Sequence, residues 1–501
     1  VWYLADVQWG EGGAIGATLP GAPPVVIGRN REVGWGLTTA NVDDQDVFIE
    51  KLHPEDPTRY RTPDGWESFE ERPIRIEVAG GAPIFDLARR TRHGPVLSHD
   101  IYGVDAVTPE GHVAALSWTA LRDEDLTMSA LLELMEAGTV EEAMASASKA
   151  LAPAQNVMLA DGRDIAMVLA GAVPLRRPDS PSRGRVPSPG WGKENDWQGL
   201  MDPDDLPRIV SPRSGAIANA NNRTTDAPFP RHVSHEWDLP FRIDRIEKEL
   251  SARTFHSRDS FVALQNDAVS EMARAVLPLM ARDLWWREGT EPATSRGPEA
   301  RRATALRLLA EWNGNMDRHT PEPLIFAEWL RQLTRRLAAD ELGPLFQSIA
   351  GKRPVFVERV MRDIDGAGIW CDVDKTPERE TCDEMARAAL DDALARLARD
   401  HGPKVEGWRW GAAHTAEHVH MPLGYLGPLG LLVSITQETS GGEHTLLRGA
   451  MPGDGEEPFR NVHASGVRMV YDFGDLDRSV MIVATGQSGH PLSRHYDDLA
   501  E

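Results

Sequence analysis

The chain has 501 residues, of which 41 % are hydrophobic and 26 % are charged, a composition typical of a folded globular protein. Its 54 basic and 77 acidic side chains give a formal net charge of −23, which opposes binding to the phosphate backbone of nucleic acids. No stretch approaches the roughly 20 consecutive apolar residues that span a bilayer. These properties argue against nucleic-acid and membrane partners and predict a soluble protein.

Residues 1–240 are predicted to form a first, sheet-rich part of the fold. Short apolar runs such as "PVVIG" and "DVFIEKL" are separated by Gly, Pro and Asp over residues 1–120, as in antiparallel hairpins. Residues 125–151 have apolar positions at helical spacing that are broken at Gly138, which predicts two helices. Two strands around the turn at Asp161 and Gly162 follow, and then a Pro-rich surface crossing.

Residues 241–400 are predicted to be mainly helical, because apolar residues recur at amphipathic spacing in segments rich in Ala and Arg. Residues 401–501 return to strand patterns in "LGLLVSITQ", "GVRMVYDFG" and "RSVMIVATG", and we expect them to be strands of the same core. Strands and helices that are grouped in this way favour sheets covered by helices over a doubly wound parallel sheet.

The two cysteines, Cys371 and Cys382, lie in one charged, Pro-containing loop. We predict a disulfide between them, and two unrelated thiols are the alternative. A disulfide indicates an oxidising compartment such as a bacterial periplasm.

Two patterns are weaker candidates for chemistry. His414, His418 and His420 have spacings that suit zinc, although histidines that make ordinary hydrogen bonds in a loop are the more frequent outcome. Ser488 in "GQSGH" approximates a nucleophile elbow, but its second glycine comes one position early. A Gly-rich turn after a strand is the simpler interpretation of Ser488.

Two polar clusters call for a specific explanation. Asp43, Asp44 and Asp46 occupy three of four positions directly after a strand-like run. A second run ends in Asn219, Asn221 and Asn222. Asparagine at a strand end is usually a turn residue, but its side-chain amide is also suited to donate a hydrogen bond to a developing oxyanion.

Five segments in register resemble the large, or β, chain of the penicillin acylase family of N-terminal-nucleophile hydrolases. They are "GATLPGAPPVVIGRNREVGWGLTTANVDDQDVFIEKL", "TRHGPVL", "IANANNR", "FRIDRI" and "GQSGHPLSRHYDDL". The resemblance runs in order across nearly the whole chain and is loose only in the helical middle. It implies an α+β fold, the four-layered αββα sandwich of that family, with a helical insertion.

The resemblance also implies a catalytic mechanism. In this family a precursor cleaves itself, and a serine that becomes the first residue of the β chain attacks an amide carbonyl, assisted by its own α-amine, whose pKa of about 7.7–8.0 suits a base at neutral pH. That serine lies upstream of the match to "VWYLADVQW". We therefore expect the chain to be cut at its start and this piece alone to be inactive. We expect it to be cut at its end too, because "GHPLSRHYDDLAE" stops with no obvious terminal element. The family implies a small (α) chain from the same precursor as partner and no organic cofactor.

Three residues match catalytic positions of the family. Asn221 is the expected side-chain donor of the oxyanion hole, and Thr39 the expected backbone N–H donor. Arg242 matches the arginine that orients the asparagine and the amine of the serine, with a salt bridge at a helix start as the alternative.

The acidic cluster matches a structural calcium site of penicillin acylases. Asp43 and Asp46 occupy ligand positions, with the carbonyl of Gln45 between them, and hard oxygen ligands suit Ca²⁺. One family ligand comes from the small chain and another from the Pro-rich crossing, where this chain has Gly184 nearby.

These matches predict a periplasmic or secreted amide hydrolase that removes the acyl side chain of a β-lactam or a related small amide. The same catalyst specialised for acyl-homoserine lactones is the first alternative. A non-catalytic family member with a binding role is the second.

Overall fold

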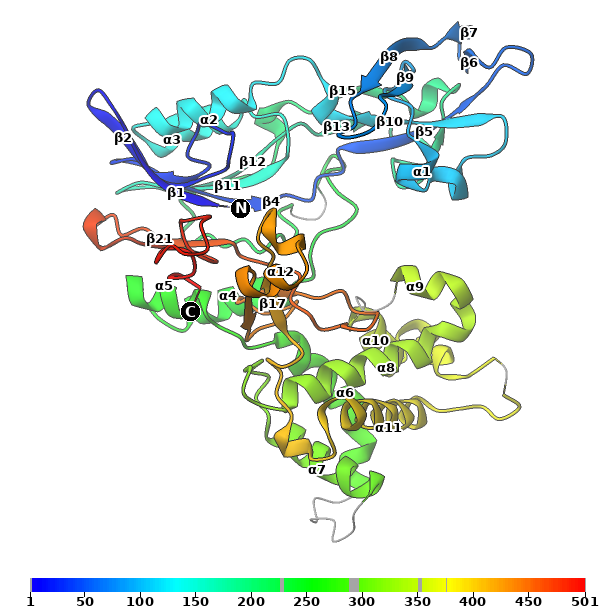
Figure 1. The fold of residues 1–501 in the computed structure, drawn as a ribbon, viewed down its shortest axis with the longest axis vertical. Coiled ribbons are helices and arrows are strands. Elements are labelled where there is room, and N and C mark those ends of the chain that lie inside the picture. Colours follow the sequence, from blue (N-terminus) through cyan, green and yellow to red (C-terminus); the bar gives the residue numbers. More distant parts are fainter. Residues whose placement is uncertain (1, 226–228, 288–296, 350–353, 375, 501) are drawn as a thin grey trace. The chain divides into compact units, whose positions relative to one another are not determined.

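The computed structural model describes residues 2–225, 229–287, 297–349, 354–374 and 376–500 (Figure 1). The chain divides into two compact units, which we describe separately: Leu4–Asp238, and Val1–Tyr3 together with Leu239–Glu501. The boundary falls close to the division predicted at residue 240. None of the described helices combines the length and hydropathy that a membrane-spanning segment needs.

A seven-stranded sheet organises the first unit. The ladders from β2 to β16 are antiparallel, as the hairpin pattern of the sequence predicts. In spatial order the strands are β1 (Tyr3–Trp9), β2 (Gly12–Thr18), β3 (Ile27–Arg29), β4 (Gly34–Thr39), β11 (Gln155–Ala160), β12 (Ile165–Ala170) and β16 (Arg208–Val210).

Two helices cover one face of this sheet, α2 (Thr127–Glu136) and α3 (Val140–Ala147) (Figure 1). The side chain of Thr139 accepts the backbone N–H of Glu142 and caps α3, and the carboxylate of Glu142 accepts the N–H of Gly138 at 2.7 Å. The prediction of two helices broken at Gly138 is confirmed. Their apolar faces pack on the sheet in a core that includes Trp35, Leu134 and Val157.

A smaller sheet, two hairpins and one further two-stranded ladder hold the other described strands of the first unit. The order of the smaller sheet is β10 (His112–Trp118), β5 (Gln45–Lys51) and β14 (Ser188–Pro189). The hairpins pair β6 (Arg59–Thr62) with β7 (Gly65–Ser68) and β8 (Glu70–Ile76) with β9 (Ile84–Arg90), and the two-stranded ladder pairs β13 (Pro174–Arg176) with β15 (Trp197–Leu200) across the Pro-rich crossing. A short helix, α1 (His99–Tyr102), follows β9.

His93 of the motif "TRHGPVL" pairs with a buried carboxylate of the small sheet. The side chain of Glu50 in β5 is fully buried, and its Oε1 lies 2.7 Å from Nδ1 of His93. Nε2 of His93 lies 3.1 Å from Asp196, whose oxygens also accept hydrogen bonds from Arg92 at 2.9 and 2.7 Å. Because a buried carboxylate is costly unless it is paired, this cluster ties β5 to the loop after β9.

Helices dominate the second unit, as predicted for residues 241–400. They are α4 (Phe241–Ser251), α5 (Arg258–Gln265), α6 (Glu271–Arg287), α7 (Pro298–Glu311), α8 (Glu322–Leu342), α9 (Phe346–Ile349), α10 (Pro354–Met361) and α11 (Cys382–His401). Their core is centred on α8, where the indole of Trp329 is fully buried and donates to the carbonyl of Ala386 in α11 at 2.8 Å. A disulfide joins Cys371 to Cys382 at the start of α11, which confirms the predicted pairing.

The strands after residue 401 differ from the prediction. They were expected in the same core sheets, but in the described part of the chain they pair only in two-stranded ladders. Each contains two to four residues, and Gly, Pro and turns interrupt the pattern between them. The ladders pair β17 (Thr415–His418) with β18 (Ile435–Glu438), β19 (Gly449–Ala450) with β20 (His463–Ala464), and β21 (Val467–Val470) with β22 (Val480–Val483).

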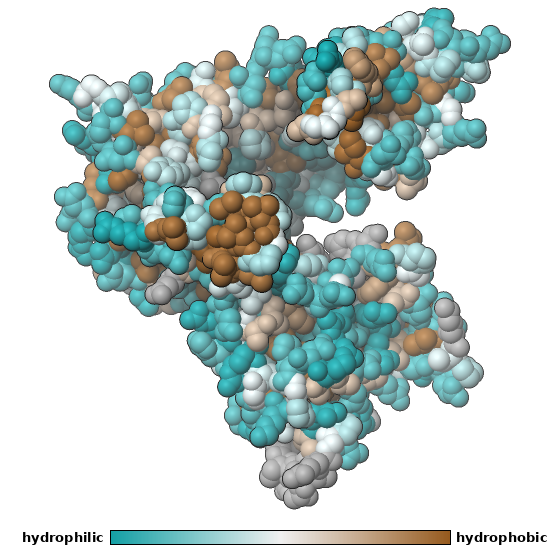
Figure 2. All heavy atoms as spheres, in the orientation of Figure 1, coloured by the Kyte–Doolittle hydropathy of each residue, from teal (hydrophilic) through white to brown (hydrophobic). Residues whose placement is uncertain are grey.

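The run "LGLLVSITQ" is only partly a strand, which corrects a second expectation. Its first half belongs to α12 (Pro428–Val433), and β18 follows. Pro428 stands at the first helical position, where its fixed φ favours helix initiation. Leu431 and Leu432 of α12 are 88 % and 81 % exposed, and Figure 2 shows an apolar patch over α12.

We predict that Asp196→Asn destabilises the protein near neutral pH but much less in acid. Partial burial opposes the charge, yet hydrogen bonds from His93 and Arg92 prevail and lower the pKa of Asp196 from 3.8 to about 2. Since the folded-state pKa lies below the unfolded value, this stabilisation is complete above about pH 4 and is lost as the pH falls towards about 2.

Urea unfolding of both proteins at several pH values checks this prediction. The difference in free energy of unfolding should shrink through that window, and a constant difference would contradict it. Asp64→Asn, which removes an exposed ion pair with Lys193, is the control and should change stability by less than about 1 kcal/mol.

Candidate active site

The three asparagines of "IANANNR" shape the loop that follows β16. Asn221 has a φ of 59°, a left-handed conformation that asparagine adopts more readily than most residues. Its backbone N–H donates to Oδ1 of Asn219 at 2.9 Å, and the N–H of Ala220 donates to Oδ1 of Asn222 at 2.9 Å. These local bonds fix the direction in which the side chain of Asn221 leaves the loop.

The structure brings the predicted oxyanion residues Asn221 and Thr39 together. Nδ2 of Asn221 donates to the carbonyl oxygen of Thr39 at 3.0 Å. Thr39 is the last residue of β4, and β11 pairs with β4 along its whole length, whereas β3 pairs only with Gly34 and Trp35. The side-chain amide therefore stands beside the end of a strand whose other edge β3 does not cover.

Polar side chains that the sequence analysis did not assign support this contact. Oγ1 of Thr38 donates to Oδ1 of Asn219, and Nδ2 of Asn156 in β11 donates to Oγ1 of Thr38 at 3.3 Å. Asn219 thus accepts from both β4 and the backbone of Asn221, which makes it a positioning residue. The repeated asparagine and the paired threonines of "GLTTA" are the only sequence signal for this network.

Arg242, the third predicted residue, belongs to the second unit, as the second residue of α4. One turn further along, the buried guanidinium of Arg245 pairs with Asp267 and with Glu249, the latter at 2.9 Å. These ion pairs fix the start of α4. The orienting role of Arg242 towards Asn221 stays a prediction.

The acidic cluster of the first unit surrounds an arginine. Nε and Nη2 of Arg176 in β13 donate to the two oxygens of Asp46 at 2.9 and 3.0 Å, and the indole of Trp197 donates to the same carboxylate. Nη2 of Arg176 also donates to the carbonyl of Asp43 at 2.9 Å, while Nη1 lies 3.3 Å from its carboxylate. The side chains of Arg176 and Asp46 are only 5 % and 6 % exposed, so this is a buried ion pair.

The remaining acidic residue has a separate environment. Oδ2 of Asp44 accepts from the indole of Trp118 at 3.4 Å, and burial raises the pKa of Asp44. Gln45 begins β5 opposite Trp118. Asp43 and Asp46 thus share the guanidinium of Arg176, whereas Asp44 has a donor of its own in Trp118.

The calcium ligands predicted at Asp43, Gln45 and Asp46 do not fit Ca²⁺ as the described residues are arranged. Calcium takes six to eight oxygen ligands, but both oxygens of Asp46 already accept hydrogen bonds from Arg176. Gly184, expected near this site, packs so tightly that a Cβ there would lie 2.5 Å from Nε of Arg176 and 2.6 Å from Oδ1 of Asp46. The guanidinium supplies the positive charge between the carboxylates.

The weaker histidine and serine candidates take structural roles. His414 is fully buried, its Nδ1 lies 2.7 Å from the carbonyl of Phe459, and burial lowers its pKa to about 4. Nε2 of His420 lies 3.0 Å from the carbonyl of Gly489, and His418 belongs to β17. The backbone N–H of Ser488 donates to the carbonyl of His495 at 2.9 Å. In the described residues these histidines form no metal-binding group.

Comparison with known proteins identifies the family. A sequence profile described as penicillin amidase matches residues 1–501. The chain belongs to the penicillin amidase family. Among curated relatives, an acyl-homoserine lactone acylase QuiP from Pseudomonas aeruginosa is 27 % identical over 99 % of this chain and 61 % of its own length. A penicillin acylase 2 proenzyme from Pseudomonas sp. is 28 % identical over 97 % of this chain and 59 % of its own length.

The fold of this penicillin amidase family chain also matches a solved structure. A thermostable penicillin G acylase from Alcaligenes faecalis aligns with a TM-score of 0.69 at 21 % identity, over 99 % of this chain and 88 % of that one. The predicted α+β, N-terminal-nucleophile hydrolase fold is thereby confirmed. The chain spans about three fifths of the length of the curated relatives that it matches.

We predict that Arg176→Met lowers the free energy of unfolding by about 3–5 kcal/mol, because it leaves the buried carboxylate of Asp46 without its ionic partner. Arg177→Met is the matched control: Arg177 is adjacent, but its ion pair with Asp179 is exposed to solvent, so its loss should change stability little. Chemical denaturation measures both. Equal losses in the two variants would contradict a dominant role for the buried pair.

Proposed function

We propose that the chain is the large-chain part of an acylase that hydrolyses the amide bond between an acyl group and a small amine or lactam nucleus. The single observation that carries this proposal is the 3.0 Å contact between Nδ2 of Asn221 and the carbonyl of Thr39, which gathers the two expected oxyanion donors at one strand end. Membership of the penicillin amidase family supports the reaction class.

The proposed reaction assigns a task to each group. A serine upstream of Val1 attacks the amide carbonyl, and the carbonyl oxygen becomes negatively charged. The side-chain amide of Asn221, which carries two N–H donors, and the backbone N–H of Thr39 stabilise this charge. Neither donor titrates near neutral pH, so the stabilisation is available whatever the protonation state of the base.

Two substrate classes follow from the relatives. The first proposed substrate is a β-lactam or a related small amide, from which the acyl side chain is removed. The relatives that are named penicillin acylases support this class. The names of six further relatives, acyl-homoserine lactone acylases 27–28 % identical to this chain, favour acyl-homoserine lactones as the second candidate. The alternative is that the protein is not an enzyme and has a non-catalytic binding role.

A small chain and an oxidising compartment complete the proposal. The word proenzyme in the name of one relative supports a precursor that is cleaved into two chains. The disulfide between Cys371 and Cys382 supports a periplasmic or secreted location, because such bonds persist where thiols are oxidised.

We predict that the product of the complete reading frame is cleaved to give a large chain that begins with serine, upstream of Val1. Intact-mass and N-terminal analysis by mass spectrometry checks this prediction. The purified protein is then assayed for release of the free amine from penicillins and from N-acyl-homoserine lactones. An uncleaved chain, or a junction without Ser, Thr or Cys, would contradict the proposed hydrolysis and favour the non-catalytic binding role.

We predict that Asn221→Ala lowers kcat by about 10²–10³ with little change in KM, because one oxyanion donor is lost while substrate binding is retained. Asn313→Ala, an exposed asparagine of the second unit, is the control and should keep the wild-type kcat. Steady-state kinetics on the better substrate class measures both. A change confined to KM would assign Asn221 to substrate binding instead.

A further inference from the structure

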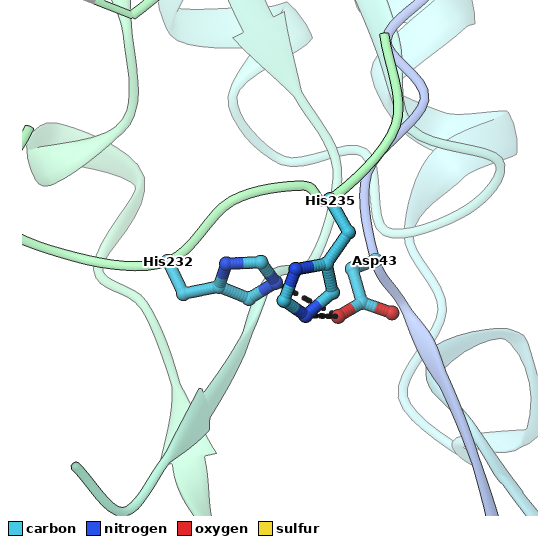
Figure 3. Close-up of side chains that lie close together, drawn as sticks. All are labelled: Asp43, His232 and His235. Carbon is cyan, nitrogen blue, oxygen red and sulfur yellow. Dashed lines mark hydrogen bonds and ion pairs between the residues drawn. The ribbon is translucent and has the colours of Figure 1, made fainter. Parts of the chain in front are cut away.

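Two histidines and one aspartate of the first unit converge on one point (Figure 3). Nε2 of His232 lies 2.8 Å from Oδ2 of Asp43, and Nε2 of His235 lies 3.6 Å from the same oxygen. The two rings are tilted by 36° to each other, with centroids 4.0 Å apart. One donor atom from each of the three residues lies within 4.8 Å of the others, and in the described part of the chain this is the one group of His, Cys, Asp and Glu side chains that is so arranged.

The backbone holds these donors in place. The N–H of Asp43 donates to the carbonyl of Val233 at 2.9 Å, and the side chain of Val233, between the two histidines, is buried. The hydroxyl of Ser234 donates to the carbonyl of Glu236 and accepts its N–H, both at 3.0 Å. The loop that carries both imidazoles is therefore fixed against the segment that carries the carboxylate before any ligand arrives.

The distances suit a small divalent ion. A tetrahedral zinc site with bonds of about 2.0–2.1 Å places its ligand atoms about 3.3–3.5 Å apart. The distances from the two imidazole nitrogens to the carboxylate oxygen of Asp43, 2.8 and 3.6 Å, bracket this range, and all three donor atoms lie within 4.8 Å of one another. The side chains of His232 and His235 are 31 % and 25 % exposed, which leaves an ion a path from solvent.

The local charge permits a cation. Asp43 and Asp46 carry two negative charges, and Arg176 supplies one positive charge. Both oxygens of Asp46 are engaged by this guanidinium, whereas Nη1 of Arg176 stands 3.3 Å from the carboxylate of Asp43. A bound ion competes with that longer contact and with the 3.1 Å contact from Nε2 of His235 to the carbonyl of Arg183. The net charge of the side chains of Asp43, Asp46 and Arg176 is therefore −1, which attracts a cation.

We propose that Asp43, His232 and His235 form a binding site for a divalent transition-metal ion of the zinc type. Two imidazoles and one carboxylate are a set that favours zinc, nickel or copper and disfavours calcium, which prefers oxygen ligands. The ion joins the segment before β5 to the loop that runs from Asn221 towards α4. The metal site formed by these three residues is independent of the proposed hydrolysis.

The test uses the protein from its complete reading frame, purified without a polyhistidine tag and stripped with a chelator. Zinc(II) is titrated in competition with a chromophoric chelator, and cobalt(II) is added separately as a spectroscopic probe. We expect one equivalent to bind, with a cobalt absorption of the intensity that four-coordinate sites show. Calcium(II) should not compete.

Single substitutions separate the site from adventitious binding. His232→Gln and His235→Gln should each weaken zinc binding at least 10-fold. His99→Gln is the matched control, because His99 also pairs with a carboxylate, that of Asp105, but has no second imidazole beside it in the described cluster. Circular dichroism confirms that each variant is folded.

Three outcomes would overturn the proposal. The first is zinc binding that is unchanged in both variants, the second is no binding in the wild-type protein, and the third is displacement by calcium. If a variant fails to fold, X-ray absorption of the zinc-loaded wild-type protein decides instead. Two imidazole ligands support the site, and a spectrum without imidazole means that His232 and His235 make hydrogen bonds only.

Discussion

The first unit depends on the bidentate ion pair between Arg176 and Asp46. Desolvating two charges is costly, and this cost is offset only when geometry and additional hydrogen bonds are good. Here the guanidinium matches both carboxylate oxygens, and Trp197 adds a donor. Gly184 leaves no room for a side chain beside the pair. One interaction thus joins β13, β15, the Pro-rich crossing and β5.

The position of β5 in turn fixes the candidate active site. Asp46 lies in β5, and Thr39 ends the preceding strand β4, so the connection between them is short. Asp43, within that connection, bonds to Val233 in the loop that leads away from Asn221. The contact between Asn221 and Thr39 is therefore supported from both ends. A rigid support of this kind is what an oxyanion hole requires, because its donors must be in place before charge develops.

The sequence predicted those features that depend on local pattern or on motifs in register. Gly138 broke an amphipathic pattern and did separate two helices, and "IANANNR" with "GLTTA" placed Asn221 near Thr39. The run "LGLLVSITQ" was misread because a short apolar run fits a helix and a strand equally well. Pro428 decides between the two for the first half of the run, because it starts a helix.

Long-range polar partners could not be predicted. Arg176 and Arg177 are adjacent and chemically identical, and no local pattern tells which one meets Asp46, 130 positions away. The same holds for His232, which is 189 positions from its partner Asp43. The expected ligands do not fit calcium for the same reason. The sequence correctly indicated that they are neighbours, but it did not indicate Arg176, the cation that pairs with them.

The separation of 182 positions between Thr39 and Asn221 has a consequence for synthesis. Closing so long a loop costs little more free energy than closing a loop of half the length, because the entropy grows only with the logarithm of length. The time that synthesis takes constrains the formation of this contact more than the loop entropy does. At about 5–20 residues per second, β4 is synthesised about 10–40 s before Asn221. Any chemistry that needs both groups cannot begin on the nascent amino-terminal half and must wait for the loop that carries the asparagines.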